Sequence, residues 1–275
     1  MKIDAHQHFW NPTRGDYFWM PPDHPVLAKQ YAPVDLAPML ERHGISKTVM
    51  VQAADTVTET EYMLGIADTT ASVAGVVGWV DFEKPGDLEH LRRFARHPKF
   101  KGVRPMIQDI PDVDWMLRDD VQWGYRALVD LDLTFDALGF PQHLDNFGTL
   151  LARYPDMRVV IDHCMKPQIR DRAFAGWAPG MTRLAGETGA YLKLSGIVTE
   201  AADGWTIEDL KPYVDHVLQA FGPDRVMWGS DWPVCQLQAS YEHWFDVAEA
   251  LTDHLSAGEK ARVFGGTAAE FYRLG

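Results

Sequence analysis

The sequence predicts a (β/α)8 barrel formed by one domain spanning residues 1–275. Short runs rich in β-branched and apolar residues recur about eight times, as expected for buried parallel strands. Amphipathic helical stretches lie between them, and no linker or low-complexity segment interrupts the alternation. No glycine-rich phosphate turn follows the first strand, which disfavours the main structural rival, a doubly wound open sheet.

The expected elements follow one another along the whole chain. Strands are predicted over residues 2–6, 47–53, 73–80, 100–107, 131–138, 157–163, 190–196 and 225–231, each dominated by residues such as those in "VAGVVGWV". Helices with apolar residues at helical spacing are predicted over residues 33–45, 86–98, 143–155, 181–189 and 210–223. Gly44 is the expected C-cap of the first helix, and glycine or proline also follows most of the others.

Composition excludes several classes of function. The 275 residues are 46% hydrophobic, enough for a large core, and the net charge of −13 includes no basic cluster that would bind nucleic acid. No apolar run is long enough to cross a membrane and no signal-peptide core is present, so we expect a cytoplasmic protein. Cys164 and Cys235 form no CxxC pair, which disfavours a thiolate zinc site. The oligomeric state, homo-oligomers included, stays open.

Ionisable residues gather where the predicted strands end, which is where barrels of this kind carry their active sites. They are His6 and His8 after the first strand, Arg104 on the fourth, Asp136 on the fifth, Asp162 and His163 on the sixth, Lys193 on the seventh and Asp231 on the eighth. His6 and His8 are two residues apart, so they share one face of a strand and converge.

Structural explanations compete with functional ones for some of these residues. Lys193 could form a buried ion pair with Asp136 or Asp162, and His163 alone could be a core histidine. The joint occurrence of histidines and carboxylates at strands one, six and eight favours a functional site over packing. Cys164 follows His163 directly, but we expect it to be a small packed residue.

Four motifs in the same order resemble the amidohydrolase superfamily. They are "DAHQHFW" at residues 4–10, "VIDHCMKP" at 160–167, "LKLSG" at 192–196 and "MWGSDWPV" at 227–234. More narrowly, they resemble its sugar-lactonase branch, which includes fuconolactonase-like and rhamnonolactonase-like enzymes. The resemblance covers essentially the whole chain, and it implies the same barrel fold and the hydrolysis of a sugar lactone to its aldonic acid.

The resemblance also shows where this chain departs from the family. Amidohydrolases with two metals use a lysine or glutamate on strand four and a histidine on strand five, whereas this chain has Arg104 and Asp136 there. A binuclear site is therefore not expected. One divalent metal held by His6, His8 and Asp231 would suit Zn²⁺, although some lactonase relatives are thought to work without metal, so its occupancy stays open.

Lactone hydrolysis assigns a role to each residue. We expect Asp231 to act as the general base and to return its proton to the ring oxygen as the lactone opens. His6, His8 and His163, with or without a metal, are expected to hold water and to polarise the carbonyl. Arg104 would hydrogen-bond the oxygens of the substrate or the carboxylate of the product.

The expected substrate is a small-molecule sugar lactone. Trp10, Trp19 and Trp232 offer aromatic faces for a sugar ring, although they could equally seal the barrel mouth, and Asp136 and Lys193 complete the predicted substrate-binding set. Three alternatives remain: a hydrolase of a dicarboxylic lactone of the pyrone or muconolactone type, a metal-dependent decarboxylase, and a non-enzymatic sugar-acid binding barrel. The scarcity of strand-end cations favours a neutral lactone over a dicarboxylic one.

Overall fold

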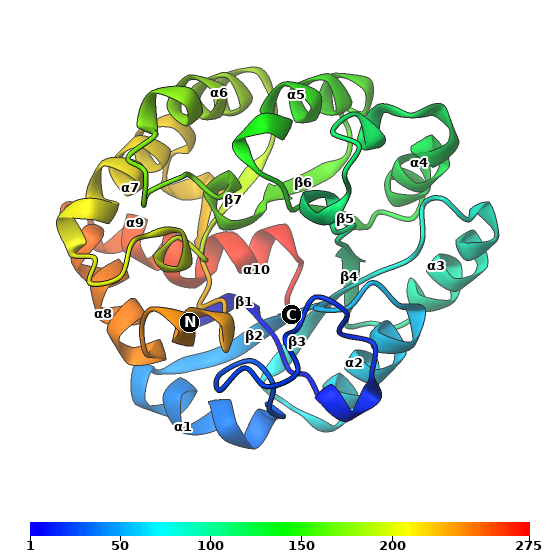
Figure 1. Ribbon diagram of the computed structural model, residues 1–275, viewed down its shortest axis with the longest axis horizontal. Coiled ribbons are helices and arrows are strands. Elements are labelled where there is room, and N and C mark those ends of the chain that lie inside the picture. Colours follow the sequence, from blue (N-terminus) through cyan, green and yellow to red (C-terminus); the bar gives the residue numbers. More distant parts are fainter.

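A computed structural model describes residues 1–275 and contains the predicted barrel (Figure 1). Eight parallel strands pair in the order of the sequence: β1 (Lys2–Gln7), β2 (Ile45–Val51), β3 (Val73–Gly78), β4 (Phe100–Val103), β5 (Thr134–Ala137), β6 (Arg158–Ile161), β7 (Tyr191–Leu194) and β8 (Val226–Trp228). Around them lie α1 (Pro33–His43), α2 (Val57–Thr69), α3 (Leu88–Phe94), α4 (Gln122–Asp130), α5 (Leu144–Arg153), α6 (Phe174–Glu187), α7 (Ile207–Phe221) and α8 (Tyr241–Leu251), followed by α9 (Ala257–Ala261) and α10 (Thr267–Phe271).

The seam between β1 and β8 is joined by few backbone contacts and by one buried carboxylate. A single bridge links Gln7 to Trp232. The Asp4 carboxylate accepts hydrogen bonds from the backbone N–H of Ser230 at 2.8 Å and of His6 at 3.2 Å. Burial raises the pKa of Asp4 to about 6 against these hydrogen bonds. Asp4 therefore fixes the first strand, with its histidines, against the segment that carries Asp231.

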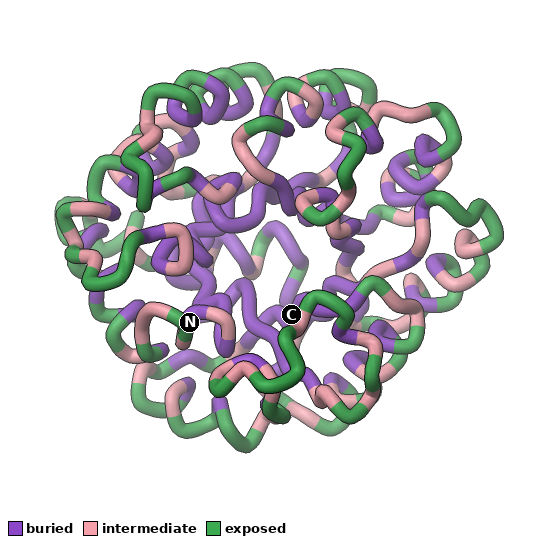
Figure 2. The backbone as a smooth tube through the Cα atoms, in the orientation of Figure 1, coloured by how far each residue is buried: buried purple, intermediate pink, exposed green.

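Apolar residues form two cores on either side of the strands. The larger core lies between the strands and the outer helices, so Figure 2 shows buried backbone at the centre and exposed backbone on the outer turns of the helices. The smaller core fills the barrel, where Ile3, Val49 and Met227 pack with Phe271 and Tyr272. The C-terminal helix α10 therefore closes the end at which the strands begin.

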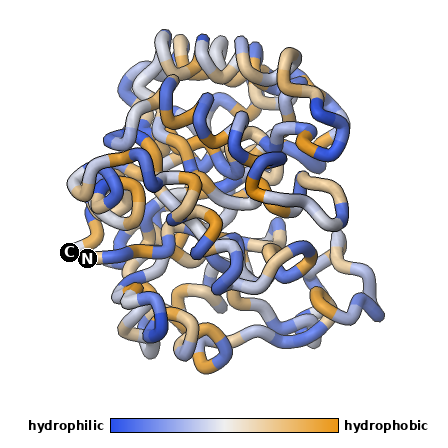
Figure 3. Tube along the Cα trace, turned by 90° about the vertical axis from the view of Figure 1, so that its left-hand side faces the viewer, coloured by the Kyte–Doolittle hydropathy of each residue, from blue (hydrophilic) through white to orange (hydrophobic).

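Both chain termini lie at the end of the barrel that is opposite to the strand ends bearing the histidines. In the side view the two termini are next to each other at one edge (Figure 3). The Lys47 ammonium, near the start of β2, donates a hydrogen bond to the Gly275 carbonyl. No helix in the chain is long and apolar enough to span a bilayer.

The predicted element boundaries differ from the structure mainly at the strand ends. The predicted strands over residues 100–107, 157–163 and 225–231 each extend beyond the end of the observed strand. Helix α6 begins seven residues earlier than predicted, at Phe174, and α2, α4 and α8 were not predicted individually. Helix α2 gives a weak signal because its apolar residues do not gather on one face. Gly44 does cap α1, with a φ of 66°.

Gly102 is expected to be essential for the pairing of β4 with β5. A Cβ atom at this position would lie 2.0 Å from Thr134 Oγ1 and 2.3 Å from the Thr134 carbonyl oxygen, which is part of the backbone. We expect Gly102→Ala to lower the free energy of unfolding by about 1–3 kcal/mol or more, measured by urea denaturation. The control is Gly148→Ala in α5, where the nearest atom is 3.8 Å away, and which should stabilise by about 0.5–1 kcal/mol. Equal stability of the two variants would contradict this account.

Candidate active site

A cavity of about 230 Å³ opens at the C-terminal ends of the strands, and three of the four predicted catalytic residues, His8, His163 and Asp231, lie in its wall. The fourth, His6, is fully buried and lies behind the wall. It is lined by His8, Trp10, Trp19, Ala53, Arg104, Met106, Gln108, Asp109, Leu138, His163, Lys166, Asp231 and Val234. We refer to it as the histidine cavity. These residues come from loops that follow six of the eight strands, so the barrel brings together groups that are far apart in sequence.

His6 and His8 converge as their spacing predicts. Their Nε2 atoms lie 3.2 Å apart, and His8 Nε2 lies 3.2 Å from Asp231 Oδ1. His8 Nδ1 lies 2.7 Å from the Val51 carbonyl oxygen, which can only accept, so this nitrogen carries a proton. In neutral His8 the Nε2 lone pair therefore faces the Asp231 carboxylate. Two acceptors at this distance suit a cation placed between them.

The backbone that presents His163 and Asp231 is strained. His163 begins a run of four residues, ending at Lys166, with φ values between 46° and 57°, and Asp231 has a φ of 55°. This left-handed region costs non-glycine residues of order 1 kcal/mol each and is concentrated at functional sites. Gly196, at φ 62°, packs so closely that a Cβ would lie 2.4 Å from His163 Nδ1. Only glycine fits there, which explains the glycine of "LKLSG".

The electrostatics of the histidine cavity favour an ionised Asp231 and a neutral His163. Burial alone would raise the pKa of Asp231, but the facing histidines, His163 first among them, lower it well below its usual range. Burial lowers the pKa of His163 to about 4, although Asp231 and Asp162 oppose this effect. His163 Nε2 lies 3.9 Å from Asp231 Oδ1, and its Nδ1 lies 2.9 Å from Ser195 Oγ.

A buried charge network lies directly beneath the histidine cavity. Lys193 is fully buried, and its Nζ lies 2.5 Å from Asp136 Oδ2, 3.0 Å from Asp162 Oδ1 and 3.2 Å from His6 Nδ1. Tyr272, from the C-terminal end, donates its hydroxyl proton to Asp136 at 2.6 Å. Burial would raise the pKa of Asp162, but Lys193 holds it well below its usual range. Lys193 and Asp162 both contact His6 Nδ1, so the network fixes the orientation of the His6 ring.

The structure places the predicted substrate-binding residues in two groups. Arg104, Trp10 and Trp19 line the histidine cavity. Asp136 and Lys193 do not line its wall and are paired with each other inside the barrel, so their predicted contact with substrate stays a prediction. Trp232 also lies outside the wall.

Two of the three tryptophans in the predicted set, Trp10 and Trp232, are buried. The ring of Trp232 is buried against Phe9 and Tyr31, with centroid distances of 5.9 and 5.0 Å, so it packs between the loops at the barrel mouth. The Trp10 indole is also buried and donates to the Lys29 carbonyl at 2.9 Å, which fixes its orientation. Cys164 is buried, with its Sγ 3.5 Å from the Lys193 carbonyl oxygen, as expected for a packed residue.

Sequence reasoning missed Lys166 and Asp109, which also line the histidine cavity. Lys166 belongs to the quoted motif "VIDHCMKP", so its position in the motif could have indicated it. Asp109 follows β4 in a short helical turn and carries no such signal. His143 is buried, with its Nδ1 accepting from the Phe140 N–H at 3.0 Å, whereas we would expect a loop histidine to be exposed.

Glu59 anchors the loop that positions Trp19. Its Oε2 accepts from the backbone N–H groups of Ala53 at 2.9 Å and Ala54 at 2.6 Å. The Ala53 carbonyl in turn accepts from Trp19 Nε1 at 2.6 Å. Burial raises the pKa of Glu59 to about 8, against the effect of the two backbone donors.

We expect Glu59 to make folding less favourable as the pH rises. The unfolded carboxyl ionises near its ordinary pKa of 4.5, whereas the folded one keeps its proton up to about pH 8. The folded state therefore binds more protons in this window, so the free energy of unfolding falls between the two values. Urea denaturation at pH 5 and pH 8 should show a smaller pH effect for Glu59→Gln than for the wild type. Identical effects in both proteins would contradict the assignment.

Comparison with known proteins identifies the family of this chain. The amidohydrolase family profile matches residues 3–274. The chain belongs to the amidohydrolase family. It is 40% identical to an L-fucono-1,5-lactonase of Burkholderia ambifaria, over 99% of this chain and 96% of the relative. An L-fucono-1,5-lactonase of Burkholderia multivorans is 37% identical, over 100% and 96% of the two chains. The predicted resemblance is therefore confirmed.

Solved structures confirm the fold of this amidohydrolase. An amidohydrolase from Burkholderia multivorans, solved with bound zinc, superposes with a TM-score of 0.95 at 35% identity. The match covers 100% of both chains. The same protein solved with bound HEPES gives a TM-score of 0.94.

The donor atoms of this amidohydrolase fit one divalent metal. Ligand atoms of His6, His163 and Asp231 lie within 4.8 Å of one another. The separation of 3.2 Å between His6 Nε2 and His8 Nε2 is close to the roughly 3.3 Å expected for two nitrogens about 2.0–2.1 Å from a tetrahedral zinc. The carbonyl of Val51 fixes the tautomer of His8 with Nε2 free, as is usual for a metal-binding histidine.

Proposed function

We propose that this amidohydrolase hydrolyses a sugar 1,5-lactone to its aldonic acid, with L-fucono-1,5-lactone as the first candidate substrate. The observation that carries the proposal is the convergence of His8, His163 and Asp231 on one side of a cavity whose wall also carries Arg104 and Lys166. A hydrolase of a neutral ester needs a base, a carbonyl activator and groups that bind the product carboxylate, and this set contains all three. The two lactonases at 37–40% identity support the same activity.

Hydrolysis requires water to attack the lactone carbonyl carbon and the ring C–O bond to break. Asp231 is ionised and lies beside the histidines, so it accepts the proton of the attacking water at a carboxylate oxygen. As the tetrahedral intermediate collapses, Asp231 returns the proton to the departing ring oxygen. The new carboxylic acid then loses its remaining proton to solvent, and the resulting carboxylate lies next to the cationic side chains of Arg104 and Lys166.

The remaining residues orient these groups. The Val51 carbonyl holds His8, and Ser195 holds His163, so neither ring needs to reorganise during the reaction. Lys193 and Asp162 fix His6 from below. When bound, a divalent metal held by His6, His8, His163 and Asp231 would polarise the carbonyl and lower the pKa of water.

One observation favours a second candidate, the hydrolysis of a dicarboxylic lactone. Two cationic side chains, Arg104 and Lys166, line the histidine cavity, whereas the sequence pointed to Arg104 and Lys193. Each already faces a carboxylate: Arg104 lies 3.3 Å from Asp162 and Lys166 lies 3.9 Å from Glu200. Asp109 and Asp231 add negative charge to the same wall, so we favour the neutral sugar lactone.

The test is acid release, followed with a pH indicator, from neutral 1,4- and 1,5-aldonolactones and from 2-pyrone-4,6-dicarboxylate. We expect turnover of sugar 1,5-lactones and little of the dicarboxylate. Preferential turnover of the dicarboxylate would replace the first candidate with the second. Parallel samples, one chelated and one reloaded with Zn²⁺, show whether a metal is required, and zinc content measured on each sample shows whether the protein binds it.

A further inference from the structure

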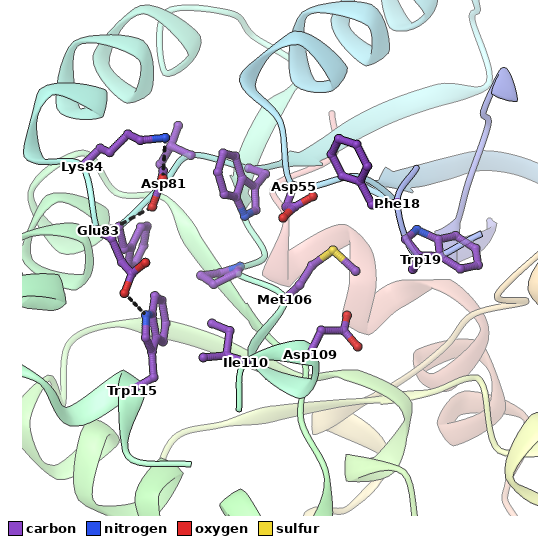
Figure 4. Close-up of a pocket in the computed structure, with 14 residues that line it drawn as sticks. Phe18, Trp19, Asp55, Asp81, Glu83, Lys84, Met106, Asp109, Ile110 and Trp115 are labelled. Atoms are coloured by element: carbon purple, nitrogen blue, oxygen red, sulfur yellow. Dashed lines mark hydrogen bonds and ion pairs between the residues drawn. The ribbon is translucent and has the colours of Figure 1, made fainter. Parts of the chain in front are cut away.

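A second cavity of about 550 Å³ lies beside the histidine cavity and takes no part in the proposed hydrolysis. Loops that follow β1, β2, β3 and β4 line it (Figure 4). We call it the aromatic cavity. Trp19, Met106 and Asp109 line both cavities, so the two share a wall. A group attached to a lactone in the histidine cavity would therefore extend into the aromatic cavity.

The aromatic cavity offers several rings to a ligand. Phe18, Trp19, Trp79 and Trp115 all contribute to its lining. Phe18 is 79% exposed and Trp19 is 39% exposed, so both rings are accessible to a ligand. In Figure 4 Phe18 lies next to Asp55, above Met106 and Asp109 in the view. Rings flanked by carboxylates suit the C–H faces and the hydroxyls of a sugar.

The charges of the aromatic cavity exclude an anionic ligand. It carries four carboxylates, on Asp55, Asp81, Glu83 and Asp109, and one ammonium, on Lys84. Lys84 lies 2.9 Å from Asp81. Glu83 accepts from Trp115 Nε1 at 3.3 Å and pairs with an arginine.

Two of these carboxylates have no cationic partner. Asp55 forms no ion pair, and Asp109 accepts only the Gln108 amide at 3.3 Å. Both can therefore accept hydrogen bonds from hydroxyl groups, whereas a phosphate or a carboxylate would be repelled.

We propose that the aromatic cavity binds a neutral sugar unit carried by the lactone, so that the substrates of this enzyme include glycosyl-aldonolactones. The proposal rests on the proposed lactonase function and adds a substrate class to it. The sizes of the cavities support binding of the lactone in one and of the sugar unit in the other. The histidine cavity is smaller than the roughly 300–1,000 Å³ typical of ligand pockets, whereas the aromatic cavity is within that range.

Turnover of matched lactones tests the proposal. The monosaccharide lactone with the highest kcat/KM is compared with the same lactone carrying a neutral hexosyl group on each ring hydroxyl in turn. We expect at least one hexosyl form to have a kcat/KM about tenfold higher, mainly through a lower KM. A uronosyl group at the same position should give no gain, because of the carboxylates. A neutral hexosyl group that gives no gain at any position would overturn the proposal.

Variants assign any gain to the aromatic cavity. Phe18→Ala and Trp79→Ala should each remove roughly two- to tenfold of the gain and leave the monosaccharide kcat/KM unchanged. Phe18 is largely exposed, so its truncation does not threaten the fold. Val34→Ala, at a 75% exposed apolar residue of α1 outside both cavities, is the matched control and should change neither value. A gain that persists in both cavity variants would contradict the assignment.

A binding measurement separates failure of this proposal from failure of the lactonase function. If no lactone is hydrolysed, the proposed lactonase function fails. Sugar binding in the aromatic cavity is then tested by itself, by following intrinsic tryptophan fluorescence during titration with methyl β-lactoside. Saturable binding that is weakened in Phe18→Ala but not in Val34→Ala supports a neutral sugar site. The absence of saturable binding, or equal binding in both variants, overturns it.

Discussion

Replacing Asp231 with asparagine is expected to preserve the fold and to lower lactone kcat/KM by about 10²–10⁴-fold. Asparagine has nearly the same shape, so the packing of this buried residue is kept, but its amide cannot accept the proton of the attacking water. The loss should appear in kcat, because substrate binding relies mainly on other residues of the histidine cavity. Steady-state kinetics and circular dichroism on the same preparation measure both properties.

Asp109→Asn is the matched control for this prediction. Asp109 also lines the histidine cavity, but it is exposed and lies far in sequence from the histidines, and its only side-chain hydrogen bond is with Gln108. Its replacement should change kcat only slightly. Near-normal turnover by Asp231→Asn, or an equal loss in both variants, would rule out Asp231 as the base.

Replacing Lys193 with methionine is expected to lower the free energy of unfolding by about 3–5 kcal/mol. The variant leaves the buried carboxylates of Asp136 and Asp162 without the ammonium that lies 2.5 Å and 3.0 Å from them. Methionine fills similar space, so the loss would reflect uncompensated charge rather than a cavity. Urea denaturation followed by tryptophan fluorescence measures the change.

Two further variants separate the buried charge from a general effect of losing a lysine. Lys211→Met removes an exposed lysine that pairs with Asp215 at 2.8 Å, and it should change stability by no more than about 0.5 kcal/mol. Adding Asp136→Asn to Lys193→Met should restore part of the lost stability, because Asp136 has no other cationic partner, whereas Asp162 still lies 3.3 Å from Arg104. If Lys193→Met were as stable as Lys211→Met, the network would not hold the barrel interior together.

The barrel itself was predictable because the pattern is local. Each strand is a short apolar run and most helices have one apolar face, so the order of elements can be read without tertiary information. The convergence of His6 and His8 was predictable for the same reason, since the alternation of strand side chains fixes it. Family motifs then placed His163 and Asp231 at the same end of the barrel.

Other features depend on contacts that no local pattern encodes. Residues 163–166 look like the continuation of a strand, but tertiary contacts hold them in a left-handed turn. Lys193 and Asp136 are on strands, and their side chains point into the barrel. Whether such a side chain pairs with another strand residue or reaches the cavity depends on its depth in the barrel, which the strand pattern does not encode. The aromatic cavity forms between four loops, so its residues became neighbours only in the folded chain.

The most direct test of the central claim is kcat/KM for L-fucono-1,5-lactone, measured by acid release with purified protein against a protein-free control. We expect saturable turnover with a kcat/KM of at least about 10⁴ M⁻¹s⁻¹, the lower end of the range typical of enzymes acting on their own substrates. A rate equal to that of the protein-free control, with this lactone and with its stereoisomers, would contradict the claim that the histidine cavity is a sugar lactonase site.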